Sequence, residues 1–409
     1  MKKRLISGAV FACAMVSVGL LPAWARSSNS HPTGEKPPGE QPGAPSTMTT
    51  STMTGPLAAN PNPISFDAGP LGPVYLTGAV SGLGLWQNNT SPGDQHSWAS
   101  LSNAQLFLQK TDGVFQYDVQ VGTYTIPDLG IPYVNTLRAT ADYFGPVPMA
   151  YVKVAPTDTF SIQAGKLLGL IGVEYNFSFQ NMNIERGLLW NQEPQIGRGG
   201  QLNYTAGPLA LGFSLDDGFL SHRHTSLSGS ASYTLDSANS FVSVAGGSYA
   251  NTTEASSATA SFQNNQAAFT LVCTYNAPPW TITPYFQYTN VPAKSSIGAF
   301  TSASTLGGAI LANYSFGDDS PLPRLSLPIR FEYISSTGSP AHGAPNLLYG
   351  PGSNAWSVTV TPTYQYKIFF ARAEFSFVRT SNTTAGLALG PSGTNTTQTR
   401  VLFETGILF

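Results

Sequence analysis

Charged side chains make up only 10% of this chain, and several of them stand two or four positions apart late in the sequence. The pairs are Arg330 and Glu332, Arg372 and Glu374, and Arg400 and Glu404. In an extended strand, residues two or four apart point to the same face. Each pair can therefore place a guanidinium beside a carboxylate. Such pairs either produce an electric field that orders water and polar solutes, or neutralise each other and only stabilise the wall.

A second group of chemically competent residues comprises Asp216, Asp217, His222 and His224. The two histidines are two positions apart, so an extended backbone would put both imidazoles on one side. Imidazole and carboxylate groups can bind metal ions or act as general bases. No cysteine completes the set, so a solvated loop is favoured and no metal or cofactor is predicted. A barrel hydrolase with these residues at its rim is kept as an alternative.

The segments that would position these side chains are short runs in which apolar and polar residues alternate. In residues 114–122, Phe115 and Val119 lie on one predicted face, and Asp118 lies on the other between two glutamines. Such a period of two indicates a strand with one apolar face. About 14 to 16 runs of this kind fit into roughly 335 residues, which is the spacing of a transmembrane barrel.

The predicted fold is therefore all-β: a transmembrane antiparallel β-barrel of about 14 to 16 strands over residues 74–409. Beyond the first 25 residues no apolar window reaches about 18 residues, which excludes helical membrane spans. In a barrel the face opposite the lipid lines the lumen. Asp118 and the three arginine and glutamate pairs are accordingly the predicted pore-lining residues.

Residues 1–25 have the composition of a secretory signal peptide. A basic start, Met1-Lys-Lys-Arg4, precedes an apolar stretch, and Ala23-Trp-Ala25 offers a cleavage site. Residues 26–73 are rich in Pro, Ser and Thr, which predicts a disordered periplasmic tail. Without the three basic residues of the signal, 16 basic and 21 acidic residues are left, a net charge of −5. Because there is no basic stripe, no nucleic-acid partner is expected.

The stretch from Leu167 to Ile196 interrupts the alternation for longer than any other part of the predicted barrel. Its charged residues include Glu174, Glu185, Arg186 and Glu193. Rings of charged side chains at a constriction set the selectivity of a pore. We therefore expect this stretch to be a constriction loop that folds into the lumen, while a surface loop without a transport role is equally compatible with the sequence.

Part of the same region resembles a known family. The similarity runs from Ala150 to Leu167, continues through Leu170-Ile-Gly-Val-Glu-Tyr175, and ends with Gln180-Asn-Met-Asn-Ile-Glu-Arg-Gly-Leu-Leu-Trp-Asn191. These residues resemble the putative β-barrel porin-2 (OmpL-like) family of bacterial outer-membrane proteins. The resemblance implies a pore-forming barrel, and it brings no catalytic motif.

The C-terminal residues 398–409 form an alternating strand that ends on Phe409. Phe403 and Phe409 share its apolar face, and Arg400 and Glu404 share the other. This resembles the closing strand of bacterial outer-membrane barrels. The resemblance implies that the barrel-assembly machinery binds this strand and that Phe409 is the assembly signal.

Together these features predict a bacterial outer-membrane porin, exported by its signal peptide. Small hydrophilic solutes would diffuse passively through a water-filled lumen, without enzymatic activity or a cofactor. The predicted partners are outer-membrane lipid, the barrel-assembly machinery and the solutes, and a homo-oligomer is left open. The alternatives are the barrel hydrolase and a surface adhesin or scaffold barrel with a closed lumen.

Overall fold

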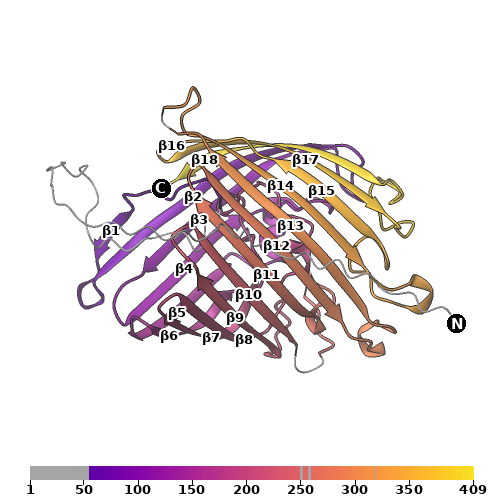
Figure 1. Ribbon diagram of the computed structural model, residues 1–409, viewed down its shortest axis with the longest axis horizontal. Coiled ribbons are helices and arrows are strands. Elements are labelled where there is room, and N and C mark those ends of the chain that lie inside the picture. Colours follow the sequence, from indigo (N-terminus) through magenta and orange to yellow (C-terminus); the bar gives the residue numbers. More distant parts are fainter. Residues whose placement is uncertain (1–54, 249–251, 257–258, 318) are drawn as a thin grey trace, which may run out of the picture. The chain divides into compact units, whose positions relative to one another are not determined.

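The computed structural model describes residues 55–248, 252–256, 259–317 and 319–409. All of them belong to one compact unit, Pro45–Phe409. The predicted signal peptide and residues 26–54 of the predicted tail lie outside the described residues. The described strands form one antiparallel sheet whose long, tilted strands curve around an interior (Figure 1).

The strands are β1 (Ile64–Asp67), β2 (Pro73–Gln87), β3 (Ser97–Lys110), β4 (Phe115–Tyr124), β5 (Met149–Thr157), β6 (Phe160–Leu168), β7 (Ile196–Ala206), β8 (Leu209–Asp216), β9 (Ser226–Thr234), β10 (Asn239–Ser248), β11 (Ala267–Ala277), β12 (Trp280–Val291), β13 (Ala303–Ser315), β14 (Leu325–Ser336), β15 (Asn354–Val360), β16 (Thr363–Tyr366), β17 (Phe369–Ser381) and β18 (Thr397–Leu408). The one described α-helix is α1 (Thr136–Asp142), and single 3-10 turns are η2 (Gly69–Leu71), η3 (Ser178–Gln180), η4 (Trp190–Gln192), η5 (Gln263–Asn265), η6 (Ser295–Ile297) and η7 (Pro340–His342).

Sixteen strands make up the closed barrel. β15 and β16 occupy one strand position, because both pair with β14 on one side and β17 on the other. The interruption falls at Thr361 and Pro362, and a proline cannot donate a hydrogen bond to the ladder. From β2 onward the strands pair in sequence order, and β18 pairs with β2. The predicted fold class and strand number are thereby confirmed.

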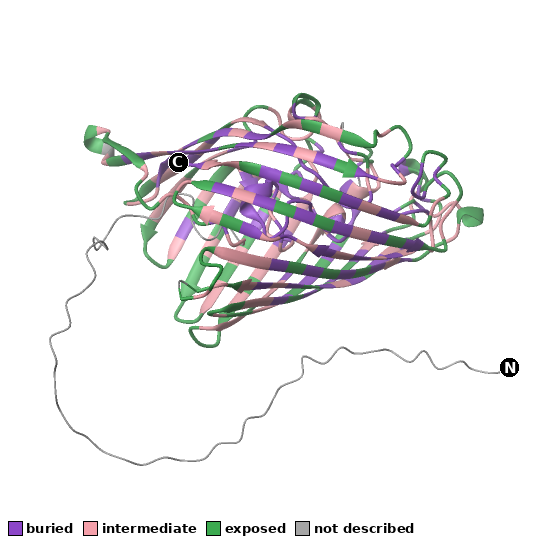
Figure 2. Cartoon of the chain, turned by 90° about the horizontal axis from the view of Figure 1, so that it is seen from above, coloured by how far each residue is buried: buried purple, intermediate pink, exposed green. Residues whose placement is uncertain are grey.

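Apolar side chains cover the outside of the barrel, where lipid would be in contact. On β17, Phe375 is 50% exposed, whereas its neighbour Glu374 is 2% exposed. On β18, Phe403 is 54% exposed and Glu404 is fully buried. Figure 2 shows buried and exposed residues alternating along such strands. The inward and outward faces therefore match the predicted parity.

The two ends of the sheet meet at the chain terminus. The backbone N–H of Gly78 donates to the carbonyl oxygen of Phe409 at 2.8 Å, and the N–H of Phe409 donates to Gly78 at 3.0 Å. The phenyl ring of Phe409 lies so close to Gly78 that a β-carbon there would collide with it. The terminal phenylalanine therefore seals the seam between β18 and β2.

Short turns join the strands at the end of the barrel that holds the C-terminus, as at 158–159 and 207–208. Longer connections lie at the other end, among them 125–148 and 169–195. Within the described part of the chain, no helix is long and apolar enough to span a membrane.

Residues 55–72 differ from the prediction of a disordered tail up to residue 73. β1 pairs with β2 in this region, and Leu57 is 3% exposed. Leu57 packs in a cluster with Phe177, Phe370 and Leu408. The prediction is wrong here because the segment's composition gives it nothing to bury alone, whereas the barrel supplies an apolar surface and a strand partner.

Candidate functional site

The segment 169–195 between β6 and β7, here called the lumen loop, is folded into the barrel. Every residue from Asn176 to Leu189 is buried. Leu188 and Leu189 pack in a core cluster with residues of β11 to β17, and Phe177 packs against Tyr124 and Phe179. Apolar packing therefore contributes to holding both halves of the loop against the inner wall.

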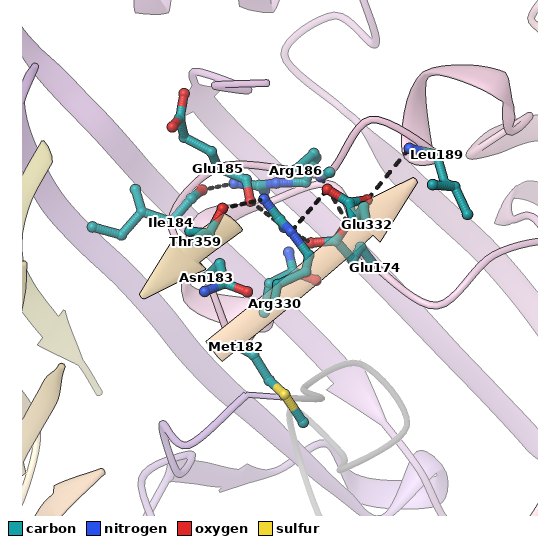
Figure 3. Close-up of polar contacts among 12 residues, drawn as sticks. Glu174, Met182, Asn183, Ile184, Glu185, Arg186, Leu189, Arg330, Glu332 and Thr359 are labelled. Carbon is teal, nitrogen blue, oxygen red and sulfur yellow. Dashed lines mark hydrogen bonds and ion pairs between the residues drawn. The ribbon is translucent and has the colours of Figure 1, made fainter. Parts of the chain in front are cut away.

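Arg330 on β14 is the first charged anchor of the loop. Its Nη1 donates to Glu174 Oε1 at 2.5 Å and to the carbonyl oxygen of Glu185 at 2.8 Å. Its Nε lies 3.2 Å from Glu332 Oε2 in an ion pair. Figure 3 shows the guanidinium between the two carboxylates, one from the loop and one from its own strand. Glu332 in turn accepts the backbone N–H of Leu188 at 3.1 Å.

β17 holds the tip of the loop with an acidic and a basic residue. Glu374 accepts the backbone N–H groups of Ile184 at 2.5 Å and Glu185 at 3.0 Å. Arg372 donates to three loop carbonyl oxygens, at 2.6 to 2.9 Å. Those carbonyls belong to Ser178, Asn181 and Met182. These wall residues therefore bind backbone groups that have no other strand partner.

β18 supplies the third pair of anchors. Arg400 Nη1 donates to Glu185 Oε1 at 2.7 Å, and Glu404 Oε1 accepts from the hydroxyl of Ser178 at 2.5 Å. Glu404 also lies 3.7 Å from Arg372 across the strand pair. All six late-strand residues of the predicted pairs thus belong to one network with the lumen loop.

Two further predicted loop residues have internal roles. Arg186 is fully buried and donates to the carbonyl oxygens of Asn176 and Ile184. Glu193 accepts hydrogen bonds from Tyr285 and from Gln287, which it meets at 2.7 Å on β12. Neither partner was predicted from the sequence, because no periodic signal relates a loop carboxylate to a distant strand.

Asp118 is separate from this network. It lies on the inner face of β4 and is 5% exposed. Its partner is Gln109 on β3, whose Nε2 donates to Asp118 Oδ2 at 2.8 Å.

The electrostatic effect of burial is large in this network. Burial raises the pKa of Glu174, and the neighbouring Arg330 opposes that shift. Burial likewise lowers the pKa of Arg186, with Asp128 the main opposing charge. Removing one member of a buried pair leaves a charge without compensation, so each anchor depends on its partner. The network is a fixed structural connection between loop and wall.

The part of the interior away from this network carries little charge. The partly exposed residues of the lumen loop are Gly169, Leu170, Gly172, Val173, Tyr175, Trp190, Asn191 and Pro194, all uncharged. On the inner faces of β7 and β9, Asn203, Ser230 and Ser232 are also partly exposed. Two charged residues of that wall are partly exposed, Lys153 on β5 and Asp216 on β8. The partly exposed side chains of this part of the inner wall are therefore polar and mostly neutral.

The rim group of two aspartates and two histidines does not assemble into a reactive site. Asp217 is 1% exposed and forms an ion pair with Arg198 at 2.9 Å. The side chains of His222 and His224 are exposed, and the backbone N–H of His222 donates to Asp217 Oδ2 at 3.3 Å. Among the residues that the structure describes, no group of three His, Cys, Asp or Glu side chains could hold a metal ion.

The structure is a closed barrel, and its charged inner wall binds a loop that is folded into the lumen. Comparison with known protein families shows where this architecture belongs. Residues 73–409 match the sequence model of the putative beta-barrel porin-2, OmpL-like family. This chain belongs to that family. The family and its fold place the protein among porin-like barrels of the outer membrane, which argues for a non-enzymatic channel class.

Solved porins share the fold of this porin-2 family member at low sequence identity. The anion-selective porin from Comamonas acidovorans superposes with a TM-score of 0.56 at 13% identity, covering 82% of this chain and 99% of that one. The channel DcaP of Acinetobacter baumannii gives 0.54 at 11% identity, with 82% and 97% covered. Salmonella typhi OmpF gives 0.52 at 13% identity, with 85% and 100% covered. No match was found among curated proteins.

Proposed function

We propose that this chain is a passive outer-membrane channel for small hydrophilic solutes, with weak preference between anions and cations. One observation carries the proposal. The buried arginines and glutamates of the network bind each other and the loop backbone, while the partly exposed surface of the lumen loop is uncharged. Charges must face the ion path to select strongly among ions, and these do not.

The lumen loop is the proposed constriction. It occupies part of the cross-section, and its charged residues Glu174, Glu185, Arg186 and Glu193 fix its position. In this proposal the paired wall residues hold the lumen loop in place, and the loop separates them from the solute. These residues are Arg330, Glu332, Arg372, Glu374, Arg400 and Glu404. Solutes would pass along neutral polar surfaces.

The test is a planar-bilayer recording of the purified full-length protein. We expect stepwise ohmic openings, and a reversal potential near zero across a tenfold KCl gradient. A reversal potential close to the limit for pure anion or pure cation flow would contradict the weak selectivity.

A closed scaffold barrel is the second candidate, because one observation favours it. Residues 55–58 enter the same interior as the lumen loop, and Gln365 exchanges two hydrogen bonds with the backbone of Ala58, at 2.7 and 2.9 Å. Both segments reduce the free cross-section. Correctly folded protein that never opens in the bilayer would support this candidate over the channel.

A further inference from the structure

Two cations stand side by side on the outer surface of the barrel. Lys166 of β6 is paired directly with Arg198 of β7. Both have the parity of outward residues, since Ile162 on β6 is 44% exposed and Leu202 on β7 is 42% exposed. Each is the third residue from the strand end that joins the lumen loop. Because the longer connections of such barrels are extracellular, these cations lie near the headgroups of the outer leaflet.

The positive charge of this pair is only partly neutralised. Like charges directly opposite each other on neighbouring strands are destabilising. Asp217 forms an ion pair with Arg198 at 2.9 Å, and the side chain of Arg198 remains 38% exposed. The Nζ of Lys166 donates to the carbonyl oxygens of Phe144 and, at 3.1 Å, of Val147. Within the described part of the chain Lys166 forms no ion pair. One positive charge is therefore left for an anion from outside the barrel.

A groove of about 590 Å³ lies on the same outer surface, over the neighbouring strands β6 to β10 (Figure 1). Most of its lining residues point away from the lumen. Leu211 and Phe213 on β8 are paired directly with Ala231 and Gly229 on β9. This step from large to small side chains leaves a hollow in the apolar surface. Its volume is within the range of small-molecule sites, roughly 300–1,000 Å³.

The groove begins on the strand that carries Arg198. Leu202 and Tyr204 belong to its lining and share the outward face with Arg198. They follow it by four and six residues, which is about 14 and 20 Å along a strand. With a strand tilt of roughly 35–45°, the longer distance corresponds to a depth of about 15 Å, or half of a hydrocarbon core. An anionic head with an alkyl chain matches this order of charge and hollow.

We propose that a phosphorylated lipid of the outer leaflet binds here, with its phosphate at Lys166 and Arg198 and one acyl chain in the groove. A guanidinium matches the geometry of a phosphate, and an ammonium adds a point charge. The unneutralised positive charge selects an anionic head over a neutral one. This site lies outside the barrel, so it goes beyond the proposed channel and does not depend on passage through the lumen.

The headgroup contact is tested by native mass spectrometry of the folded full-length protein in detergent, titrated with dioleoyl phosphatidic acid. Dioleoylglycerol is the same lipid without the phosphate. We expect one phosphatidic acid to bind about tenfold more tightly than the glycerol lipid, because hydrogen bonds to charged groups contribute at least that factor. Lys166→Gln should lose about the same factor. Arg379→Gln, which removes an exposed arginine of β17 near the same end of the barrel, should bind like the parent.

The groove is tested by Ala231→Leu, which fills the hollow. This variant should weaken binding of both lipids by a similar factor, because the acyl chain loses its place. The matched control is Ala373→Leu, at an exposed position on the outer face of β17, and it should not change either affinity. Since Ala231 is exposed, its variant tests the site even where Lys166→Gln does not fold.

Several outcomes would overturn the lipid site. Equal affinity for the two lipids, or unchanged affinity for phosphatidic acid in Lys166→Gln, would remove the phosphate contact. Unchanged binding in Ala231→Leu would remove the acyl chain from the groove. Inorganic phosphate that displaces the lipid at equal concentration would show a site for free anions, and a dimer that excludes the lipid would assign the groove to a second copy. Channel conductance reports on the lumen, so a failure of either proposal would leave the other standing.

Discussion

Arg372 is a single inward residue that binds both the lumen loop and the neighbouring strand. Its guanidinium donates to three carbonyl oxygens of the lumen loop and lies beside Glu404. We expect Arg372→Ala to lower the free energy of unfolding by about 3–5 kcal/mol, because it leaves the buried Glu404 without its opposite charge and three loop carbonyl oxygens without their donor. Urea titration of refolded protein measures this change.

The matched control is Arg379→Ala, which removes an exposed arginine from the same strand. It should change stability by less than about 1 kcal/mol. Equal effects of the two substitutions would mean that the contacts of Arg372 contribute little.

Phe375 tests the other face of β17. It is 50% exposed on the proposed lipid surface, so Phe375→Arg should destabilise the inserted barrel by about 2–4 kcal/mol if the residue lies near the bilayer midplane. Phe375→Leu should be nearly neutral. A stability in lipid equal to that of the parent would show that this face does not contact hydrocarbon.

For single residues, the face of the strand to which a side chain points could be predicted from the sequence. The hydrogen-bond partners of the inward side chains could not. Alternation predicts one common face for inward residues such as Arg330, Glu374 and Arg400, and the structure buries all three. Their partners include backbone groups of the lumen loop, at Glu185 for Arg330 and at Ile184 and Glu185 for Glu374. A backbone carbonyl has no residue type, so composition and spacing carry no signal for it.

At the scale of elements, the lumen loop is the part whose removal should change flow most directly. Replacing 176–191 with a short Gly/Ser linker takes away buried volume from the interior. We expect single-channel conductance to rise clearly above that of the parent. The variant will be less stable because wall charges lose partners, so heat-modifiable mobility must first show that it is folded.

An unchanged conductance in that folded variant would remove the lumen loop from the pore. Selectivity would then have to come from the wall itself, where Asp118 and Lys153 lie away from the network.

The N-terminal segment before β1 should hold the inner side of the loop. Leu57 is buried against Phe177, so Leu57→Asp should detach residues 55–63 and speed their cleavage by added protease. The expected loss is about 1.5–3 kcal/mol of apolar burial. Asn62→Asp adds the same charge at an exposed position and should leave the cleavage rate unchanged. Equal rates for both variants would contradict the packing role.

For the whole molecule, closure depends on the last residue. Deleting Phe409 removes the ring over Gly78 and both backbone hydrogen bonds that join Phe409 to Gly78 at the seam. We expect export to the periplasm to continue and insertion of the barrel to fail. Cell fractionation with a heat-modifiability assay measures both steps, and a fully inserted deletion variant would show that Phe409 is dispensable.

The barrel architecture could be predicted from the sequence because many weak strand signals repeat along one chain. The packing inside the barrel could be predicted only in part. For residues 169–195 the break in alternation and the charged side chains predict a constriction loop but not its contacts, and for residues 55–72 the polar composition predicts a disordered tail. Both segments are ordered by surfaces that exist after the barrel has closed, so local patterns could not reveal their packing.

The lumen loop has a mechanical consequence as well. It is tied to β14 through Arg330, to β18 through Arg400, and to β12 through Glu193. A hollow cylinder flattens easily under lateral pressure, whereas one braced from within resists in the direction of the brace. The loop should therefore stiffen the barrel most along the diameter between these anchors, and less across strands β5 to β9, which supply none of the three.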